Sequence, residues 1–410
     1  YIGMWKSVSG DIEVDYLLPS ELLAIKMVFE ELSYEEIRKE TGMKYREIDI
    51  ALKEAVKKGL ILKPQSKIRR ENELFSKGFI KEKTFLETDI FTLQWHITQA
   101  CDLHCRHCYD RSERQSVSYG DALKVLDDFW RFCRNMHVRG QISFSGGNPL
   151  LHPMFFDIYK EAYDRGFILA ILGNPVSEDI LLKLLSIKRP SFYQVSLEGL
   201  EEHNDYIRGR GNFKRVLKFL DLLKKYNIYS MVMLTLTEEN IDQVIPLGRI
   251  LRNRVKLFSF NRLAMVGEGK QLRLPYRERY MKFIGEYLEE CKRNPILGIK
   301  DNLINLYKYK HGGNLFGGCT GYGCGAAFNF LSLLSDGEVH ACRKLPSLIG
   351  NIYEQSLEDI YLSEIAERYR RGPEACRDCE ISIVCRGCLA VAYGYGMNIF
   401  KDRDPYCFKI

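Results

Sequence analysis

The chain has 410 residues, of which 46% are hydrophobic and 28% charged, a composition typical of a globular protein with two or three domains. No apolar run approaches the length of a membrane span and no export signal is present, so we expect a cytoplasmic protein with no membrane partner. The net charge of +6 is modest, and the basic cluster of Lys67, Arg69 and Arg70 is typical of a solvated face, so charge does not indicate nucleic-acid binding. The chain begins with Tyr1, and we expect the native start to be missing.

Residues 1–85 are predicted to form a separate small domain. A helix is expected over Glu21–Glu30, and a second helix begins at Ser33, whose spacing to Glu36 is that of a capping box. A third helix is expected over Arg46–Lys58, followed by a strand over Leu60–Leu62. This order of elements is typical of a winged helix-turn-helix domain.

Two uses of this N-terminal domain stay open. Winged helices commonly bind DNA, but the third predicted helix carries Glu47, Asp49 and Glu54, which repel a phosphate backbone. The alternative is a peptide clamp, in which an extended segment adds to an exposed strand edge. We predict peptide recognition and keep DNA binding as the alternative.

From residue 86 to 300, strand-like and helix-like segments alternate. Six strands are predicted, at Phe91–Thr98, Gln141–Phe144, Phe167–Leu172, Phe192–Leu197, Tyr229–Thr237 and Val255–Phe260. Amphipathic helices are predicted between them, for example at Tyr119–His137, Phe213–Tyr226 and Ile241–Arg252. Six β/α repeats without a seventh or eighth predict an α/β fold with a partial (β/α)6 parallel barrel, whose active site lies at the carboxyl ends of the strands.

Three cysteines, Cys101, Cys105 and Cys108, follow the first predicted strand with the spacing CxxxCxxC. Three thiolates this close in sequence can ligate three irons of a 4Fe-4S cluster and leave the fourth iron open for chemistry. Zinc is the alternative, and His104 and His107 inside the loop would allow a mixed Cys/His site. No fourth ligand follows at ribbon or finger spacing, so the pattern favours a cluster.

The remaining cysteines also indicate metal binding. Thirteen cysteines in a chain without an export signal favour metal ligation over disulfides. Cys133 and Cys291 lie in predicted helices and are expected to be buried or half-buried residues without a ligand role. The other eight fall in residues 301–410, predicted to be a small domain held together by metal: Cys319, Cys324, Cys342, Cys376, Cys379, Cys385, Cys388 and Cys407.

Two further loops at predicted strand ends carry polar or glycine residues. The segment Ser145-Gly-Gly-Asn-Pro149 follows the second strand, where two glycines can expose backbone groups to a polar ligand, although a plain βα turn fits equally well. Ser196 and Glu198 end the fourth strand, and Arg208 follows in a Gly-Arg-Gly context that is more often a simple turn than a phosphate loop.

Together these motifs resemble the radical S-adenosylmethionine (SAM) superfamily, over about residues 88–410. The resemblance implies that Cys101, Cys105 and Cys108 hold the SAM-binding cluster. Gly146, Gly147 and Asn148 correspond to the family's Gly-Gly-Glu segment, which meets the amino group of SAM; Asn148 keeps a carbonyl acceptor but lacks the charge. The other implied cofactor-binding residues are His107 at the family's aromatic position, the adjacent Tyr109, Pro149, Ser196 for the ribose and Arg208 for the carboxylate. No further catalytic residue is assigned.

The C-terminal segment resembles the SPASM domain, which binds two auxiliary 4Fe-4S clusters. The resemblance implies that one cluster is held by Cys319, Cys324, Cys342 and Cys388. It implies that the other is held by Cys376, Cys379, Cys385 and Cys407. Only two residues separate Cys385 from Cys388, where the family usually has three. The implied cofactors are SAM and three 4Fe-4S clusters, with two structural zinc sites as the alternative for the C-terminal set.

A winged-helix front end on a radical SAM and SPASM body resembles the maturases of ribosomally made peptides. The resemblance implies capture of the leader of a small precursor peptide, cleavage of SAM to a 5'-deoxyadenosyl radical, and an oxidoreductase- or lyase-type reaction on the peptide. Thioether or other crosslink formation at or near Cys residues is implied, with a flavodoxin or ferredoxin as reductant. The segments Ile97–Ser112 and Ser145–His152 resemble the subgroup that matures selenocysteine- or cysteine-containing peptides.

Two other functions stay open. Anaerobic sulfatase-maturating enzymes share the same body, but they tend to carry an Asp directly after the third SPASM cysteine, where this chain has Arg343. An iron-sulfur DNA-binding regulator would use the N-terminal fold on DNA and need no SAM pocket. Release of 5'-deoxyadenosine together with leader binding would distinguish the peptide maturase from the regulator.

Overall fold

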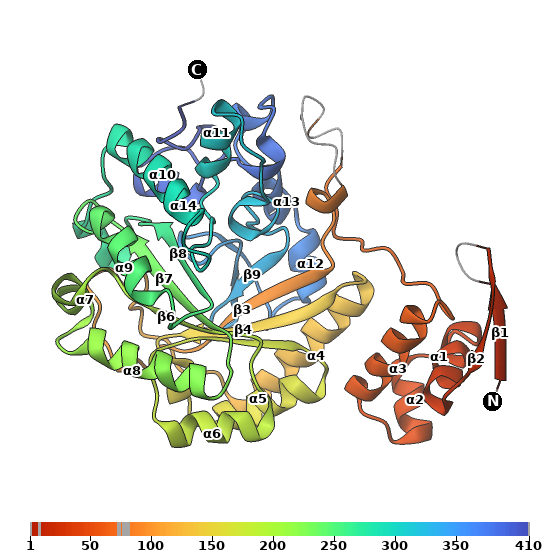
Figure 1. Ribbon diagram of the computed structural model, residues 1–410. Coiled ribbons are helices and arrows are strands. Elements are labelled where there is room, and N and C mark those ends of the chain that lie inside the picture. The colour runs from red at the N-terminus through yellow and green to blue at the C-terminus, as the bar shows by residue number, and fades with distance from the viewer. Residues whose placement is uncertain (1, 7–9, 72–74, 76–82, 409–410) are drawn as a thin grey trace.

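A nine-stranded sheet forms the centre of the computed structural model, which describes residues 2–6, 10–71, 75 and 83–408. The strand order is β11-β10-β9-β3-β4-β5-β6-β7-β8 (Figure 1). Six neighbouring strands are parallel and follow chain order: β3 Ile90–Thr98, β4 Arg139–Gly146, β5 Ile168–Leu172, β6 Tyr193–Ser196, β7 Ser230–Leu236 and β8 Leu257–Arg262. Each of the six predicted strands overlaps one of these.

The helices between these strands cover one side of the sheet. They are α4 Tyr119–Asn135, α5 Phe155–Asp164, α6 Glu178–Ile187, α7 Glu201–Arg208, α8 Asn212–Lys225 and α9 Val244–Leu251, with the 3-10 turns η3 Pro149–Leu151 and η4 Ile241–Gln243. Because strand order follows chain order, right-handed crossovers place successive helices on the same side, as in a β/α barrel (Figure 1). The predicted α/β fold with a mostly parallel sheet is confirmed. Among the described residues, no helix is long and apolar enough to cross a bilayer.

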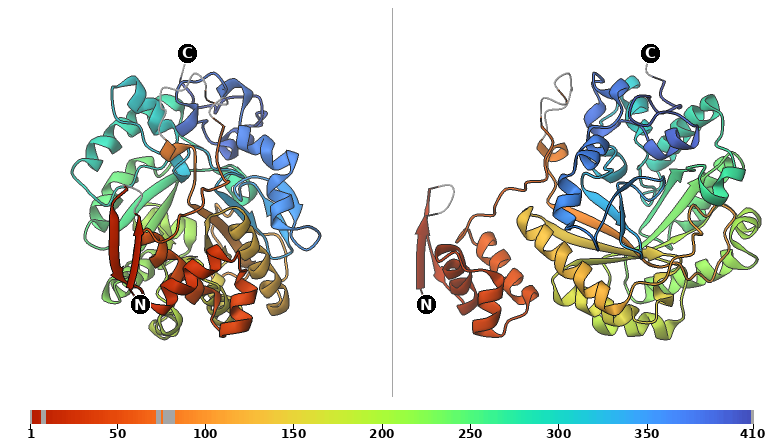
Figure 2. Two further views of the ribbon diagram at one scale, coloured as in Figure 1. Left: turned by 90° about the vertical axis from the view of Figure 1, so that its right-hand side faces the viewer. Right: turned by 180° about the vertical axis from the view of Figure 1, so that it is seen from behind.

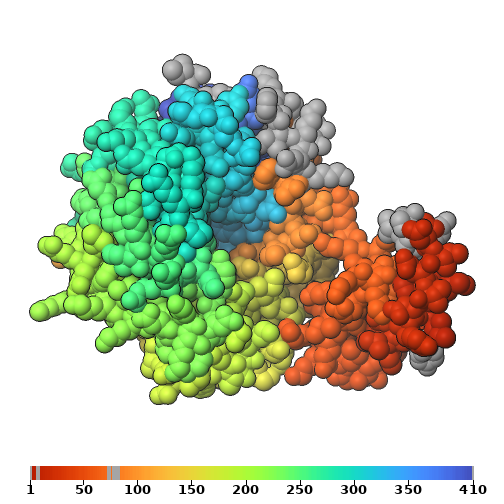
Figure 3. Space-filling view, in the orientation of Figure 1, coloured from red at the N-terminus to blue at the C-terminus, as the bar shows by residue number. Residues whose placement is uncertain are grey.

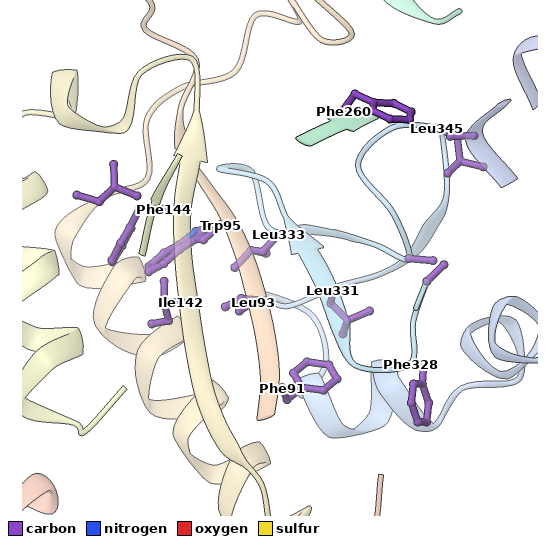
Figure 4. Close-up of a cluster of buried hydrophobic side chains, with 14 of the residues drawn as sticks. Phe91, Leu93, Trp95, Ile142, Phe144, Phe260, Phe328, Leu331, Leu333 and Leu345 are labelled. Carbon is purple, nitrogen blue, oxygen red and sulfur yellow. The ribbon is translucent and has the colours of Figure 1, made fainter. Parts of the chain in front are cut away.

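Side chains on the parallel strands alternate between an apolar outer face and a polar inner face. On the outer face, Phe144 packs against Trp95 (Figure 4). Phe144 also packs against Phe155 of α5, and the rings of Phe91 and Phe132 of α4 lie 4.7 Å apart. The alternate positions at the inner face include Gln94, His96, Ser143, Ser145, Gln194, Ser196 and Thr235. Parallel sheets are usually apolar on both faces, so the polar inner face indicates a place where polar ligands bind.

The cysteine-rich C-terminal segment extends the same sheet. This strand pairing was not predicted from the sequence. Strand β9 pairs in parallel with β3, and β10 and β11 continue antiparallel. These strands have only three or four residues, too few for a recognisable alternation. The elements of this region are α10 Arg277–Cys291, α11 Leu303–Lys310, β9 Phe330–Leu333, β10 Glu338–His340, β11 Leu348–Asn351, α12 Leu357–Leu362, α13 Glu364–Arg371 and α14 Leu389–Gly394.

The N-terminal segment is a two-stranded hairpin followed by three helices. The elements are β1 Ile2–Lys6, β2 Ile12–Tyr16, α1 Pro19–Phe29, α2 Tyr34–Thr41 and α3 Tyr45–Lys57. The three predicted helices and the capping box between Ser33 and Glu36 are present. The predicted strand at residues 60–62 is wrong, because Leu60 N–H closes the end of α3 on the Ala55 carbonyl and Leu62 is exposed. The strands precede the helices, so the predicted winged order is not reproduced.

The N-terminal helices dock on the barrel helices α4 and α5 (Figure 3). Arg134 of α4 forms an ion pair with Asp49 of α3 at 2.9 Å, and Tyr34 donates a hydrogen bond to the same carboxylate at 2.7 Å. The ring of Tyr34 meets Trp130 edge-on at 5.1 Å. The chain after α3 then runs to the cysteine-rich segment (Figure 2). There Arg70 donates hydrogen bonds to backbone carbonyls. The hairpin and helices are thereby held in place beside the barrel.

A buried ion network joins the barrel to the cysteine-rich segment. Arg262, the last residue of β8, is 3% exposed and pairs with Asp301 at 2.7 Å and Asp404 at 2.6 Å. Asp404 also accepts a hydrogen bond from the Cys388 N–H. The network therefore orients a predicted ligand loop as well as the end of β8.

We expect Arg262→Met to destabilise the protein by about 3–5 kcal/mol, because two buried carboxylates lose their counter-charge. Thermal and denaturant unfolding would measure the change. Arg249→Met is the matched control: its ion pair with Glu290 is on the surface, with 64% of the arginine side chain exposed, and its loss should change unfolding little. An Arg262 variant as stable as the parent protein would contradict the structural role of this network.

Candidate active site

The three-cysteine motif lies in the loop between β3 and α4, at the carboxyl end of the parallel strands. Cys101 is exposed, and Cys105 and Cys108 are half-buried. The side chains around this loop come from the ends of β4, β5 and β6, as expected for a barrel active site. The sequence therefore predicted the place of the motif in the fold; its role as a ligand set stays a prediction.

Two glycines at the end of β4 allow the cysteine loop to pack against the strand. The N–H of Gly147 donates to the Thr98 carbonyl at 2.9 Å, and the N–H of Asn148 donates to the Ala100 carbonyl at 2.7 Å. A side chain at Gly146 or Gly147 would collide with these main-chain carbonyls, and Gly146 also has a φ of 122°. The Gly-Gly segment therefore fixes the cysteine loop, in addition to any contact with a ligand.

The side chain of Asn148 presents an unused acceptor beside the cysteine loop. Asn148 is 1% exposed, and its Nδ2 donates to Asp102 at 3.2 Å. A carboxylate can only accept, so the amide NH2 must face Asp102. The carbonyl Oδ1 is then buried with no partner among the described residues. This atom fits the amino group of SAM, the contact that the sequence resemblance implied; Pro149 follows it in η3.

Asp102 and Asn174 were not predicted as site residues. Asn174, just beyond β5, donates to Asp102 at 2.7 Å and lies 3.6 Å from the Cys101 sulfur. Arg215 of α8 also pairs with Asp102. Although burial opposes the charge, the hydrogen bonds from Arg215 and Asn174 lower the pKa of Asp102. The position of Asp102 inside the cysteine motif was the only sequence signal for this group of polar side chains.

Glu198 is a buried anion that holds two predicted cofactor-binding residues. It is 1% exposed and accepts hydrogen bonds from Arg208 Nε at 2.8 Å and from the Thr235 N–H at 2.7 Å. His107 Nε2 lies 3.2 Å from the same carboxylate. Burial opposes the charge, but His107 and Arg208 together lower the pKa of Glu198 to about 2. The carboxylate is therefore ionised at neutral pH.

The ion pair with Glu198 also determines where Arg208 points. Arg208 Nη1 lies 3.8 Å from the Cys105 sulfur, while its Nε and Nη2 serve Glu198. The contact predicted between Arg208 and the SAM carboxylate stays a prediction. Ser196 is half-buried at the end of β6, on the inner face, and its predicted contact with the ribose likewise stays a prediction.

A second polar group, comprising His96, Tyr109 and Arg343, lies on the inner face. Arg343 Nη1 donates to Ser145 Oγ at 2.7 Å, and its guanidinium carbon lies 4.0 Å from the centre of the Tyr109 ring. His96 is 2% exposed and its ring meets Tyr109 at a centroid distance of 6.3 Å. Burial lowers the pKa of Arg343 to about 9, and burial followed by the charge of Arg343 lowers the pKa of His96. None of these contacts of Arg343 was predicted from the sequence.

The two ligand sets that the SPASM resemblance implied among the eight C-terminal cysteines stay a prediction, and two observations bear on them. Four of them line one cavity together with Leu303 and Leu306: Cys376, Cys379, Cys385 and Cys407. In the other set, burial raises the pKa of Cys342 to about 12, and the neighbouring Cys388 and Cys324 thiols add to this effect. Burial also raises the pKa of Cys324, and the neighbouring Cys319 thiol adds to this effect.

Each set provides four thiols, the donor set that a 4Fe-4S cluster takes. Among the described residues, no group of three or more His, Cys, Asp or Glu side chains is arranged to hold a metal ion. A four-iron cluster is wider than one ion, so its thiols need not converge as closely as those of a zinc site. The residues fit auxiliary clusters, whose ligands and number stay predictions. Cys133 is buried in α4 and Cys291 half-buried at the end of α10, as expected.

Two stretches of the chain match known families. Residues 95–249 match the radical SAM superfamily, and residues 324–380 match SPASM, an iron-sulfur cluster-binding domain. The chain contains a radical SAM domain and an SPASM domain. The radical SAM domain implies SAM and a 4Fe-4S cluster, and the SPASM domain implies auxiliary iron-sulfur binding.

Several known proteins are similar to this chain. The AdoMet-dependent heme synthase of Methanosarcina barkeri is 27% identical, over 77% of this chain and 95% of that protein. The mycofactocin maturase MftC of Mycolicibacterium smegmatis is 24% identical, over 77% of this chain and 82% of that protein. The crystal structure of Streptococcus suis SuiB bound to its precursor peptide SuiA has a TM-score of 0.62 and 16% identity, covering 97% of this chain and 95% of SuiB. The likeness to SuiB shows that the two proteins share a fold.

Proposed function

We propose that this protein is a radical SAM maturase that oxidatively modifies a ribosomally made precursor peptide. The observation that carries the proposal is the N-terminal hairpin, whose apolar face is exposed on a segment docked to the barrel. The names of MftC and of SuiB with its bound precursor peptide support the same substrate class. The polar inner face beside the cysteine motif supplies the site where the peptide would react.

The hairpin has its apolar side chains on the solvent side. In the β1–β2 register, Ile2 lies opposite Tyr16 and Met4 opposite Val14. These four residues and Ile12 share one face, with exposed fractions of 63–74%. The other face lies toward the rest of the N-terminal segment, since a side chain at Gly3 would collide with Leu17 and Asp15 pairs with Lys58, the residue after α3, at 3.2 Å. A two-stranded sheet is marginally stable alone, and an extended peptide that adds a strand would complete it and cover the apolar face.

Residues of the chain prepare the reaction site for this chemistry. SAM and its cluster, when bound, would supply hydrogen abstraction from an unactivated carbon of the peptide. Asn148 Oδ1 would accept a hydrogen bond from the amino group of SAM, and Glu198 holds Arg208 beside the cysteine loop. The proposed reaction is oxidative crosslinking at or near Cys residues of the peptide. The proposed substrates are those of the subgroup that matures selenocysteine- or cysteine-containing peptides, and the proposed reductant is a flavodoxin or ferredoxin.

We expect Val14→Lys to weaken binding of the precursor peptide by at least about tenfold, because burying a valine contributes about 1.5–3 kcal/mol and the lysine cannot be buried. A short Cys-containing reading frame is to be sought beside the gene, and fluorescence anisotropy with the peptide that it encodes measures the affinity. Glu13→Lys, on the same strand and the opposite face, is the matched control and should bind normally. Uncoupled SAM cleavage should be unchanged in both variants.

Two outcomes would contradict these proposals separately. Unchanged peptide affinity in Val14→Lys would remove the hairpin as the capture surface. Incubation of the reconstituted parent protein with SAM, reductant and this peptide should change the mass of the peptide by loss of hydrogen. Release of 5'-deoxyadenosine without any change in the peptide would contradict the proposed function.

A further inference from the structure

Arg343 is a cation on the inner face that has no acidic partner in the part of the chain that the structure describes. Its contacts are the Ser145 hydroxyl and the Tyr109 ring, both on the wall of the site. Its Nε is buried and without a hydrogen-bond partner among those residues. The guanidinium is therefore bound to β4 through Nη1, while its Nε stays unpaired among the described residues.

Several other arginines of the barrel are paired with carboxylates, whereas the buried Arg70 and Arg386 donate to backbone carbonyls. Arg114 contacts Asp336 at 2.6 Å, Glu338 at 3.3 Å and Asp110 at 3.3 Å. Arg208 pairs with Glu198, and Arg262 with two aspartates. Since the acids near β10 are bound by Arg114, none of them neutralises Arg343. Apart from the Cys108 thiol, which interacts electrostatically with Arg343, no acidic group of the described residues is paired with this buried cation, so the site is suited to an anion from outside the chain.

His96 lies beside Arg343 and is also unsatisfied. It is 2% exposed, and neither ring nitrogen has a hydrogen-bond partner among the described residues. Its imidazole always carries at least one N–H donor, whichever tautomer is present. An Arg edge and a His N–H beside it match the two oxygens of a carboxylate, which accepts two hydrogen bonds in a plane.

We propose that Arg343, assisted by His96, binds a carboxylate of the peptide substrate. The carboxylate belongs to an Asp or Glu side chain or to the C-terminus of the peptide, and it places the adjacent carbon beside the Cys108 end of the cysteine loop. The inference rests on the proposed peptide substrate and specifies which part of the peptide enters the site. Arg343 is thus a specificity-determining residue, at the position where sulfatase-maturating enzymes tend to carry an acid.

The test uses three synthetic peptides of ten residues, labelled with fluorescein: one neutral peptide, and two acidic peptides that each differ from it in one feature. The first carries a central Glu and a C-terminal amide, the second a central Gln and the amide, and the third a central Gln and a free C-terminal carboxylate. Binding is measured by anisotropy on the full-length reconstituted protein with SAM. We expect at least one acidic peptide to bind about tenfold more tightly than the neutral peptide, the effect of one charge-assisted contact. Which acidic peptide prevails identifies the source of the carboxylate.

Arg343→Gln should remove this preference, and Arg343→Lys should keep part of it, because lysine retains the charge but not the fork geometry. His96→Phe should weaken the preference without abolishing it. The iron content of each variant shows that it is folded and loaded, and Arg249→Gln is the control on the surface. The affinity for SAM should be the same in Arg343→Gln and the parent protein.

The outcomes separate this inference from the proposed function. No preference for acidic peptides, whether all three bind or none does, would overturn it. Weaker SAM binding in Arg343→Gln with an unchanged peptide preference would assign the arginine to the cofactor and also overturn it. Neither result affects the proposed function, which fails only if the precursor peptide is not modified.

Discussion

Replacing Cys101, Cys105 and Cys108 together with alanine is expected to abolish SAM cleavage and to lower the iron content from about twelve to about eight per chain. The cysteines of the motif lie in one loop at the carboxyl end of β3, within a radical SAM domain. If these three thiolates are the ligands, their removal leaves no cysteine in this loop to hold iron. Anaerobic reconstitution followed by iron analysis and chromatographic measurement of 5'-deoxyadenosine tests both parts.

The matched control for the triple variant is Cys291→Ala. Cys291 is half-buried at the end of α10, far in sequence from every proposed ligand, and its replacement should leave iron and SAM cleavage unchanged. Persistent 5'-deoxyadenosine formation in the triple variant would show that the motif is not the cleavage site. An iron content of about four in the parent protein would contradict both auxiliary clusters.

Replacing Cys376, Cys379, Cys385 and Cys407 with serine should remove about four irons and abolish peptide modification. The four thiols line one cavity, which is the arrangement expected of the donor set for one cluster. SAM cleavage in the absence of peptide should persist, because this cavity and the loop after β3 are built from different segments of the chain. An oxidative reaction leaves an electron on the product side, and we propose that this cluster accepts it.

This prediction has its own control in the same region. Serine variants of the other set, Cys319, Cys324, Cys342 and Cys388, should lower the iron content by the same amount. If either set of variants keeps all its iron, the corresponding cluster is wrongly assigned. If the Cys376 set loses iron but the peptide is still fully modified, that cluster has no part in the electron transfer.

The fold was predictable where the sequence repeats a long pattern. Strands such as Ile90–Thr98 and helices such as Tyr119–Asn135 show clear periodicity, because each has one face in the core. The hairpin Ile2–Tyr16 was missed because its apolar alternation faces solvent and no core fixes it. The strands after residue 330 were missed because pairing with β3, and not local pattern, determines them.

The site was predictable only where motifs are contiguous. The cysteine motif and the Gly-Gly-Asn segment could be located because each lies within a few residues. The contacts of Glu198 with His107, and of Arg343 with Ser145, join segments about 90 and 200 residues apart, and only the folded sheet brings them together. Free acceptors and donors, such as those of Asn148 and His96, appear only when all neighbours are known.

The docking of the N-terminal helices through Asp49, Arg134 and Arg70 has a consequence for which residue of the substrate reacts. If the hairpin holds the leader, the span from hairpin to reaction site is fixed by the protein. An extended chain advances about 3.3 Å per residue, so this span corresponds to a set number of peptide residues. The protein would then select its target by counting along the peptide as well as by recognising a side chain. Precursors of one enzyme should therefore share spacer length even where their spacer sequences differ.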